Sequence, residues 1–335
     1  MRQFKQAGVL GVAYSVPDNV LTNQDLEKMV DTSDKWITER TGIKERRIAA
    51  PGQATSDMSL AAGQKALDRA GVKADEIDLV IVCTLSPDTL FPSTACIVQY
   101  RIGAVNAGAF DLSAGCSGFV YGLSVACQMV NAGAHKKILV IGAETLSRIL
   151  NWKDRNTCVL FADGAGAAVI GEAPDGYGYI NSVIGSDGAG GNFIKMPAGG
   201  SRMPATAETV ANNLHAIHMD GSEVFKFASR IVPKVAFDVL KGTGIAVGDI
   251  DIVIPHQANG RIIKSAAKRL GLPIEKFYVN VERYGNTSAA SVPIALAEAW
   301  ENGLVHKGNN VLLIGFGTGL TWAGCLLKWS IEGNL

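Results

Sequence analysis

The sequence predicts an α/β protein made of two similar halves, each with a mostly parallel sheet covered by helices. Apolar strand-like runs alternate with helical patterns along the chain, which is the order found in such sheets. Two strand segments recur at one displacement of 173 residues: 77–81 as 250–254, and 138–142 as 311–315. A displacement of one size at two places indicates an internal duplication. We therefore expect βαβαβ-containing halves at 1–172 and 173–335, packed around a pseudo-two-fold axis with a site between their strand ends.

The individual elements follow from hydrophobic periodicity and from turn residues. Apolar runs predict strands, listed in chain order as 8–16, 77–83, 109–112 and 138–142. Helical spacing predicts helices near 23–30 and over 56–70, one beginning within 92–101, and one over 116–131. The uncharged run 311–327 is interrupted by Gly315, Gly317 and Gly319, so it predicts two strands around a turn rather than a membrane span.

Composition excludes several classes of protein. The 335 residues carry 31 basic and 31 acidic side chains, so no overall charge attracts nucleic acid or an anionic membrane. The six cysteines show no CxxC pairing and lie mostly in apolar runs, which predicts reduced thiols and neither a zinc site nor a disulfide framework. The N-terminus lacks the length and cleavage site of a signal peptide, and we expect a cytoplasmic protein without a metal.

Cys116 stands where a strand passes, through a turn of small residues, into the N-terminus of an apolar helix. Unpaired N–H groups and the helix dipole favour a thiolate there, so we expect a sulfur more nucleophilic than that of an ordinary core cysteine. The alternative is a small hydrophobic side chain packed in a crowded turn, which is the commoner role of a single cysteine. This stretch alone does not decide between the two.

The duplication predicts which residues meet Cys116. Shifted by 173, Cys83 becomes His256, and the turn 111–116 becomes 284–289, which contains Asn286. Taken singly, the histidine is more often a structural contact and the asparagine a turn residue or helix cap. Taken together, they predict a Cys/His/Asn cluster at the strand ends.

This cluster suits one reaction. A thiolate accepts an acyl group from a thioester and forms a covalent intermediate. The His256 N–H and the Asn286 amide, as neutral donors, would hold the carbonyl oxygen of a second thioester. Because asparagine has no useful basicity, the pair favours a decarboxylation, in which loss of CO2 generates the enolate without a base. Backbone N–H groups near Cys116 and in the glycine loop 315–319 would form a separate oxyanion hole.

Four motifs resemble those of β-ketoacyl-acyl carrier protein synthase III, the initiating condensing enzyme of bacterial type II fatty acid synthesis. They read DLSAGCSGF, PHQAN, YGNTSAAS and GFGTGLTWAG, and the resemblance runs from about residue 5 to the C-terminus. It implies a thiolase-type fold in five α-β-α-β-α layers and a homodimer. It also implies a decarboxylative Claisen condensation of a short acyl-CoA primer with malonyl-acyl carrier protein, in which acyl-CoA is a substrate and no cofactor is used.

The resemblance also implies roles for single residues. Cys116 would be the acylated nucleophile, His256 and Asn286 the decarboxylation pair, and the N–H groups of Cys116 and Gly317 the oxyanion hole. The coenzyme A contacts would be Thr32, Trp36, Arg40, Arg155 and Asn259, with Trp36 and Arg155 on the two faces of the adenine. Phe91 would enter the acyl pocket across the dimer interface. Ser222 stands where relatives often carry Asn, and the segment 188–218 is longer and looser than a compact connection.

A basic stripe follows PHQAN and predicts a docking surface for the acidic carrier protein. It consists of Arg261, Lys264 and Lys268 on one helix face, with Arg269 beside them and Lys226 from another segment. A solvated helix face is the alternative. For the whole chain, the alternatives are a type III polyketide synthase, a cysteine hydrolase and an inactive acyl-binding scaffold.

Overall fold

Two β-sheets form the frame of the computed structural model, which describes residues 6–333. The first sheet has the strand order β1-β7-β6-β4-β5, and the second has the order β11-β12-β13-β8. The strands are β1 Ala7–Ser15, β4 Leu79–Cys83, β5 Gly108–Leu112, β6 Ile138–Thr145, β7 Asp163–Glu172, β8 Gly178–Ser186, β11 Ile252–Pro255, β12 Asn310–Gly317 and β13 Thr321–Lys328. Every strand of the first sheet thus precedes every strand of the second in the chain.

The two sheets repeat one pairing register. β4 runs parallel to β6 with Leu79 opposite Ile138, and β11 runs parallel to β12 with Ile252 opposite Val311. Both members of the second pair lie 173 residues after their counterparts, as the sequence predicts. Beyond this central pair, β1 and β7 are antiparallel in the first sheet, and β8 and β13 are antiparallel in the second.

Most strands of each sheet run in one direction, as predicted, but both sheets are mixed, because β7 in the first and β13 in the second run antiparallel to both of their neighbours. In the second sheet β11 and β12 are the only neighbouring strands that are parallel. The loop between β12 and β13 has only the residues 318–320, whereas a parallel connection needs a crossover of a dozen residues or more. The short glycine-containing loop thus forces β13 to return antiparallel to β12.

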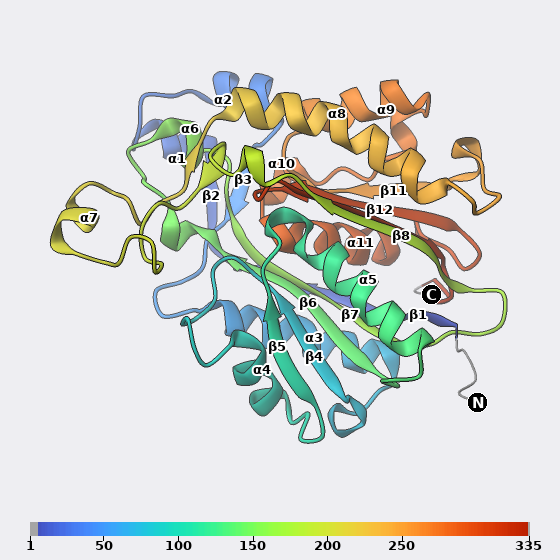
Figure 1. Ribbon diagram of the computed structural model, residues 1–335. Coiled ribbons are helices and arrows are strands. Elements are labelled where there is room, and N and C mark those ends of the chain that lie inside the picture. Colours follow the sequence, from blue (N-terminus) through green and yellow to red (C-terminus); the bar gives the residue numbers. More distant parts are fainter. Residues whose placement is uncertain (1–5, 334–335) are drawn as a thin grey trace.

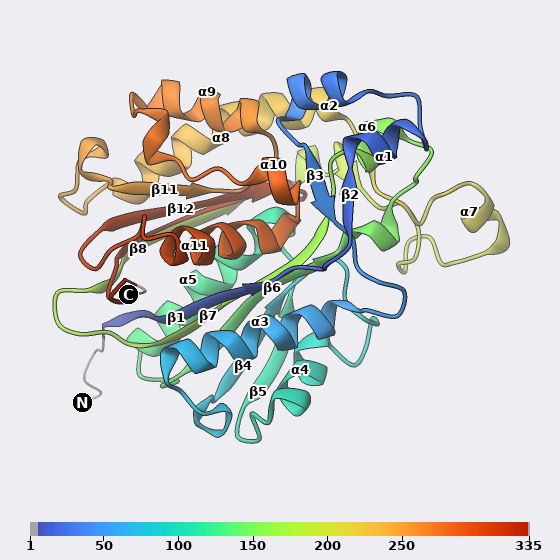
Figure 2. The same ribbon diagram turned by 180° about the vertical axis from the view of Figure 1, so that it is seen from behind.

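Helices cover both sheets and fill the space between them. They are α1 Asn23–Glu27, α2 Asp34–Thr41, α3 Thr55–Ala70, α4 Thr94–Ile102, α5 Gly118–Asn131, α6 Arg155–Cys158, α7 Ala207–Ala211, α8 Gly221–Leu240, α9 Gly260–Leu270, α10 Val281–Tyr284 and α11 Ser291–Glu301. Figure 1 shows α3 and α4 outside the first sheet, α8 and α9 outside the second, and α5 and α11 between the sheets. Figure 2 shows the same five layers from behind, which confirms the α-β-α-β-α order.

The composition of the helices decides their layer. α5 and α11 carry buried residues on almost every side, since both contact a sheet above and a sheet below. α3 and α8 instead bury one side, and their charged residues face solvent. The central hydrophobic cluster therefore lies between the sheets, and a further cluster lies under each outer pair of helices.

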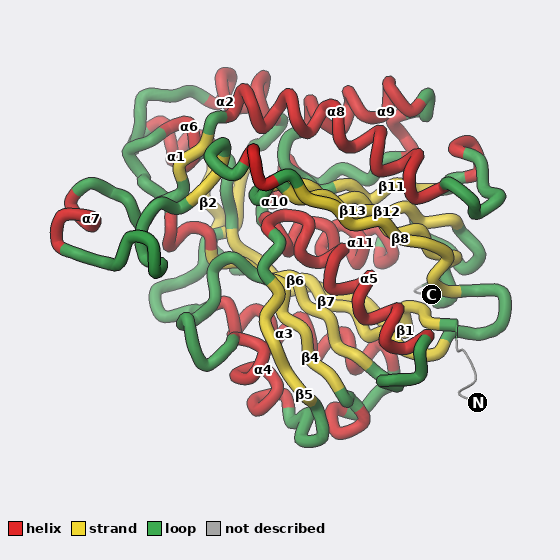
Figure 3. The backbone as a smooth tube through the Cα atoms, in the orientation of Figure 1, coloured by secondary structure: helices red, strands yellow, loops and turns green. Residues whose placement is uncertain are grey.

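Smaller elements gather at one end of the layers. The strands β2 Val20–Thr22 and β3 Glu45–Arg47 pair with each other, as do β9 Ile194–Lys195 and β10 His218–Met219. The segment between β9 and β10 contains α7 and projects from the body of the molecule, as Figure 3 shows. Over residues 6–333, no helix is both long enough and apolar enough to cross a membrane.

Candidate active site

Cys116 lies in a single 3-10 turn, Gly115–Ser117, between β5 and α5. Gly115 has a φ of 57°, a left-handed conformation that glycine adopts without strain. The loop after β12 packs directly on this turn, because a Cβ atom at Gly317 would lie 2.8 Å from Cys116 Sγ. The nucleophile and the glycine loop therefore meet as predicted, and only a residue without a side chain fits at 317.

Burial controls the ionisation of Cys116. The side chain is 5% exposed, and this burial raises the pKa of its thiol to about 11. The Ser288 side chain and the N–H groups of Thr318 and Cys116 lower that pKa, but by less than burial raises it. The loss of hydration outweighs these local donors, but burial raises the pKa of Cys127, an ordinary core cysteine in α5, further, to about 12, so the local donors favour the thiolate at Cys116 as expected. Attack by this sulfur requires an acceptor for its proton.

His256 follows β11 and lies beside β12. Its backbone N–H donates to the Ile314 carbonyl, and its ring packs edge-on against the ring of Phe316. Burial lowers the pKa of the imidazole to about 3, so the ring is neutral throughout the physiological range. Nδ1 lies 2.6 Å from Ser291 Oγ, and this oxygen is also the acceptor of the Gln257 N–H. Ser291 Oγ thus accepts one hydrogen bond from Gln257 and can donate its own proton to Nδ1. In that arrangement the ring proton is on Nε2.

Asn286 is oriented by the chain that follows it. Its Oδ1 accepts the backbone N–H of Ser288 at 2.9 Å, so its amide nitrogen is the end free to donate. Its own backbone is fixed by Leu160 and Ala162, with which it exchanges hydrogen bonds of 2.9 Å. The His256 and Asn286 side chains can thus both act as neutral hydrogen-bond donors.

A cavity of about 570 Å³, called the tunnel below, has Asn286 in its wall. Its wall includes Trp36, Arg40 and Asn259, three of the residues predicted to contact coenzyme A, together with Ser222. Asn259 caps α9 by accepting the Arg261 N–H, and its amide group donates to the Arg40 carbonyl. The tunnel therefore connects three predicted coenzyme A contacts with Asn286, one member of the predicted decarboxylation pair, whereas His256 does not line it.

The predicted adenine contacts lie together, with Trp36 in the wall of the tunnel and Arg155 beside its ring but outside that wall. The Arg40 guanidinium lies 4.7 Å from the centroid of the Trp36 ring, and that of Arg155 lies 5.3 Å from it. An adenine base can stack between Trp36 and Arg155 only after the Arg155 guanidinium moves away from the Trp36 ring. Thr32 does not line this tunnel, but its hydroxyl is buried and has no hydrogen-bond partner among residues 6–333.

A second cavity, of about 200 Å³, has Cys116 in its wall. Apolar side chains predominate in its wall, which consists of Leu85, Cys116, Leu146, Ile149, Phe161, Ile194, Lys195, Met196, Ile217, Ser288 and Thr318. Ile194, Lys195, Met196 and Ile217 come from the long segment 188–218. This segment thus borders the cavity next to the nucleophile.

Two predicted groups lie away from the cavities of this chain. Phe91 is 84% exposed and does not line the cavity beside Cys116. Of the basic residues, Lys226 and Arg261 line the tunnel, whereas Lys264, Lys268 and Arg269 are exposed farther along α9. Lys226 forms an ion pair with Glu223, and Arg269 donates to the Ser229 carbonyl.

Sequence reasoning missed two buried polar groups next to Cys116. Ser288, in the YGNTSAAS motif, is 1% exposed and has a φ of 47°, which is unusual for a residue with a side chain. Glu144 is fully buried at the end of β6. A single carboxylate directly after the apolar run 138–143 was a detectable signal, since an unpaired acidic residue is rarely buried. In residues 6–333, no group of three or more His, Cys, Asp or Glu side chains could hold a metal ion.

Family models match both halves of the chain. Residues 110–188 match 3-oxoacyl-(acyl-carrier-protein) synthase III, and residues 240–329 match the C-terminal part of the same synthase. A relative from Caldanaerobacter subterraneus subsp. tengcongensis, named beta-ketoacyl-(acyl-carrier-protein) synthase III, is 59% identical over 97% of this chain and 98% of its own. A relative from Desulfitobacterium hafniense with the same name is 53% identical over 97% of this chain and 98% of its own.

Solved structures agree with these sequence matches. The crystal structure of 3-oxoacyl-(acyl-carrier-protein) synthase III from Aquifex aeolicus superposes with a TM-score of 0.90 and is 44% identical. The alignment covers 96% of this chain and 100% of that one. Likeness of this degree over 96% of the chain includes both halves.

Proposed function

Since this chain belongs to the 3-oxoacyl-(acyl-carrier-protein) synthase III family, we propose that Cys116, His256 and Asn286 are the reacting groups of its condensation. The protein is an acyltransferase that initiates fatty acid synthesis, as its relatives over almost the full length indicate. A type III polyketide synthase, a cysteine hydrolase and an inactive scaffold are not favoured. The observation that carries the assignment of roles is that Asn286 lines the tunnel while Ser288, two residues later in the same motif, lines the second cavity together with Cys116.

In the first half-reaction, Cys116 attacks the thioester of a short acyl-CoA. Its sulfur bonds to the acyl carbon as coenzyme A leaves, and the acyl chain occupies the cavity of about 200 Å³. The N–H groups of Cys116 and Gly317 stabilise the oxyanion. The N–H of Thr318, which also faces the sulfur, is available as a further donor.

In the second half-reaction, malonyl-acyl carrier protein enters the same tunnel. Nε2–H of His256 and the amide of Asn286 donate to its thioester oxygen, so loss of CO2 leaves an enolate held by two neutral donors. The enolate carbon attacks the acyl-Cys116 carbonyl and releases the sulfur. A neutral His256 suits this step. Its ring does not titrate near pH 7, so the Nε2–H donor stays unchanged there.

Acylation of Cys116 by acetyl-CoA alone is the first expected result. Intact-mass measurement followed by peptide mapping should show one acetyl group on Cys116, because this is the only cysteine next to both cavity and glycine loop. Cys127 is a matched control, since it is buried in the middle of α5 and lines neither cavity. An acetyl group on another cysteine, or none at all, contradicts the assignment.

We assign the coenzyme A nucleotide to the outer end of the tunnel. The adenine stacks between Trp36 and Arg155, while Arg40 and Thr32 contact the phosphates and the rest of the nucleotide. The two guanidiniums beside one indole support this, because cation–π contacts and base stacking use the same ring faces. The buried hydroxyl of Thr32 gains a partner when a ligand binds. Asn259 lies next to the pantetheine.

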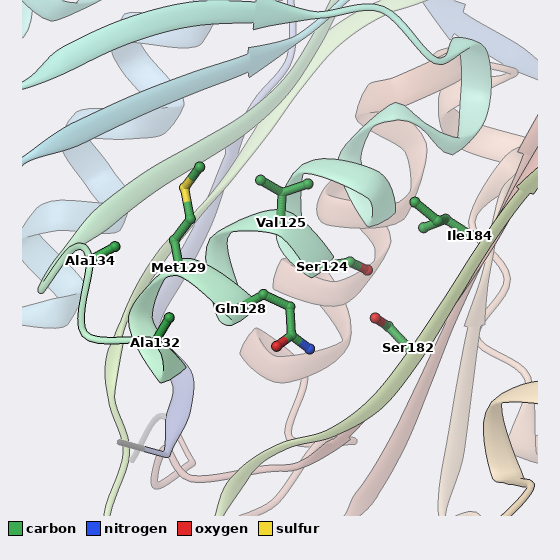
Figure 4. A pocket seen from close by; sticks show the side chains of 8 residues that line it. All are labelled: Ser124, Val125, Gln128, Met129, Ala132, Ala134, Ser182 and Ile184. Atoms are coloured by element: carbon green, nitrogen blue, oxygen red, sulfur yellow. The ribbon is translucent and has the colours of Figure 1, made fainter. Parts of the chain in front are cut away.

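A homodimer is the proposed assembly, with Phe91 of each copy reaching the partner's acyl pocket. β5 is an edge strand, and Leu90, Phe91, Tyr100, Val105 and Phe110 are large apolar residues exposed on or near it. A second apolar surface is a groove of about 410 Å³ between α5 and β8, and Figure 4 shows Val125 and Met129 on α5 and Ile184 on β8 among the side chains that line it. None of the candidate site residues lines this groove.

The exposed face of α9 is our proposed docking surface for the acidic carrier protein. Arg261 and Lys226 line the tunnel, and Lys264, Lys268 and Arg269 extend the positive charge away from it. A carrier protein bound there can insert its pantetheine arm toward Asn286.

Reversing charge on this face should weaken binding of the carrier protein only. We expect Lys264→Glu/Lys268→Glu to raise KM for malonyl-acyl carrier protein by roughly tenfold at low salt, and by less at high salt. Acylation by acetyl-CoA should stay near normal, because neither lysine lines the tunnel. Lys65→Glu on α3, on the opposite outer layer, is the matched control. Carrier-protein kinetics equal to those of the control at both salt concentrations would make α9 an ordinary solvated face.

Three further assignments complete the proposal. The functional units are the halves 1–172 and 173–335, which is supported by the separate sheets of the two halves. The reaction uses no cofactor, since acyl-CoA is a substrate and the steps above need only protein donors. The enzyme works in the cytoplasm, where acyl-CoA and carrier protein are available.

A further inference from the structure

The two N–H groups of the proposed oxyanion hole come from different halves of the chain. Cys116 stands in the turn after β5, and Gly317 is the last residue of β12, which belongs to the other sheet. Over residues 6–333, no backbone–backbone hydrogen bond joins 113–118 to 315–321. Other contacts must therefore fix the two donors relative to each other, since an oxyanion hole works only when both point at one oxygen.

Glycines let the two backbones touch in this region. A Cβ atom at Gly115 would lie 2.5 Å from Thr318 Cγ2, and one at Gly315 would lie 2.7 Å from Ser117 Cα. Such contact limits how close the turn and the glycine loop come, but it has no preferred direction. A hydrogen bond is directional, so it can also fix how the loop is shifted along the turn.

The hydroxyl of Thr321 crosses from the loop to the turn. Thr321 is the first residue of β13, just after the glycine loop. Its Oγ1 lies 2.8 Å from the Ala114 carbonyl oxygen and 2.8 Å from Ser117 Oγ, on the two sides of Cys116 in the chain. It also lies 2.9 Å from the carbonyl oxygen of Thr318, in the glycine loop. One oxygen atom thus joins the loop to the turn both before and after the nucleophile.

The proton count of these hydroxyls supports that connection. A hydroxyl donates one hydrogen bond and accepts two. Ser117 Oγ is the only donor among the three neighbours, so Thr321 accepts from it and donates to the carbonyl of Ala114 or of Thr318. Ser117 is fully buried, so water does not compete for its proton. Thr321 therefore stays bonded to the turn whichever carbonyl takes its own proton.

We propose that Thr321 is a positioning residue for the acylation of Cys116. Its hydroxyl holds the glycine loop against the turn, so that the N–H groups of Cys116 and Gly317 point at one oxygen. This rests on the proposed roles of Cys116 as the nucleophile and of the two N–H groups as the oxyanion hole. Thr321 lines neither the tunnel nor the cavity beside Cys116, so it acts through the groups that it holds.

Thr321→Val tests the hydroxyl with little change of shape, since valine keeps the branched side chain that suits a strand. Ala114 keeps a possible donor, because Ser117 Oγ lies 2.7 Å from its carbonyl oxygen. We expect acylation of Cys116 by acetyl-CoA to slow by roughly 10²-fold, the cost of a small misplacement of reacting groups. KM for acetyl-CoA should stay near that of the wild type, because Thr321 lines neither cavity.

A second reagent separates the position of the donors from the reactivity of the sulfur. Iodoacetamide alkylates a thiolate by displacing iodide at a saturated carbon, so no oxyanion forms and no oxyanion hole is needed. In Thr321→Val, alkylation of Cys116 should therefore keep its wild-type rate while acylation falls. Release of CO2 from malonyl-acyl carrier protein should also stay normal, because that step uses His256 and Asn286 as its donors.

The controls are exchanges of the same kind. Thr321→Ser keeps the hydroxyl and should restore acylation to near the wild-type rate. Ser117→Ala should lose less than Thr321→Val, because Thr321 can still donate to the Ala114 carbonyl. Thr243→Val is the matched control, since Thr243 Oγ1 donates to the Leu240 carbonyl at the end of α8, in an outer layer. It should acylate normally.

Three results would overturn the proposal. A wild-type rate of acylation in Thr321→Val would show that the hydroxyl does not position the donors. Equal losses of acylation and alkylation would show that the sulfur itself has moved, so that Thr321 only supports the fold. Equal losses in Thr321→Val and Thr321→Ser would exclude the hydroxyl as the cause. Failure of the proposed function would look different, because the wild type would then react with iodoacetamide but form no acetyl-Cys116.

Discussion

Gly317→Ala should abolish acylation of Cys116 while the fold survives. A methyl group at this position would lie 2.8 Å from both Cβ and Sγ of Cys116 and 3.1 Å from its backbone N. Real Cβ atoms do not approach so closely, so either the sulfur or the glycine loop must move. Both movements disturb the attacking atom and the oxyanion donors together, and loss of one such donor alone costs roughly 10²–10³ in rate.

The measurement is formation of acetyl-Cys116 from acetyl-CoA, followed by intact mass over time. A rate below about 10⁻² of wild type is expected from the single-donor cost. Gly303→Ala is a control, because a Cβ there meets no atom within 4 Å, although its positive φ makes alanine strained as well. It should lose stability but acylate normally. A Gly317→Ala variant that acylates at the control rate would show that the loop does not constrain the sulfur.

His256→Ala and Asn286→Ala should impair decarboxylation far more than acylation. Each variant removes one neutral donor from the thioester of malonyl-acyl carrier protein, with an expected loss of roughly 10²–10³ in CO2 release. Cys116 has its own oxyanion donors, so its acylation should change much less. Because the pKa of His256 is lowered to about 3, wild-type decarboxylation should show no loss from protonation of this ring between pH 8 and 5.

Release of CO2 and formation of acetyl-Cys116 are to be measured separately on each variant. Ser291→Ala tests the orientation of the ring, since it removes the hydroxyl at Nδ1 but leaves the imidazole in place. It should lose less activity than His256→Ala. Poor acylation with normal CO2 release in either alanine variant would reverse the division of roles.

The architecture was largely predictable, because the period of apolar residues and the repeat of strand segments at one displacement can both be seen in the sequence. Strands and helices follow from the period of apolar residues, and the register of β4 with β6 reappears in β11 with β12 at the predicted displacement. The mixed direction of the strands was not predicted. It depends on connections such as 318–320, whose shortness is visible in the sequence but whose geometry depends on both flanking strands.

The sequence predicted which residues form the candidate site but not the protonation state of Cys116. Cys116, His256 and Asn286 stand in motifs, so their positions could be named in advance. The protonation of Cys116 could not, since a helix N-terminus favours the thiolate while burial opposes it, and only the packed structure shows that burial is larger. Ser288 was visible as a letter in its motif, but its strained φ and unpaired hydroxyl exist only in three dimensions.

The repeated register explains how one chain can hold two kinds of chemistry at equivalent places. The 3-10 turns Gly115–Ser117 and Ser288–Ala290 correspond at the displacement of 173, and Ala289 stands where the first half has Cys116. A symmetric pair of identical units would be obliged to carry the same residue at both turns, so a nucleophile on one side would require a nucleophile on the other. Fusion of two copies into one polypeptide removes that obligation, because each copy then mutates independently. The asymmetry of the active site, with sulfur on one side and amide and imidazole on the other, is thus a property that a fused duplicate can acquire and a pair of identical subunits cannot.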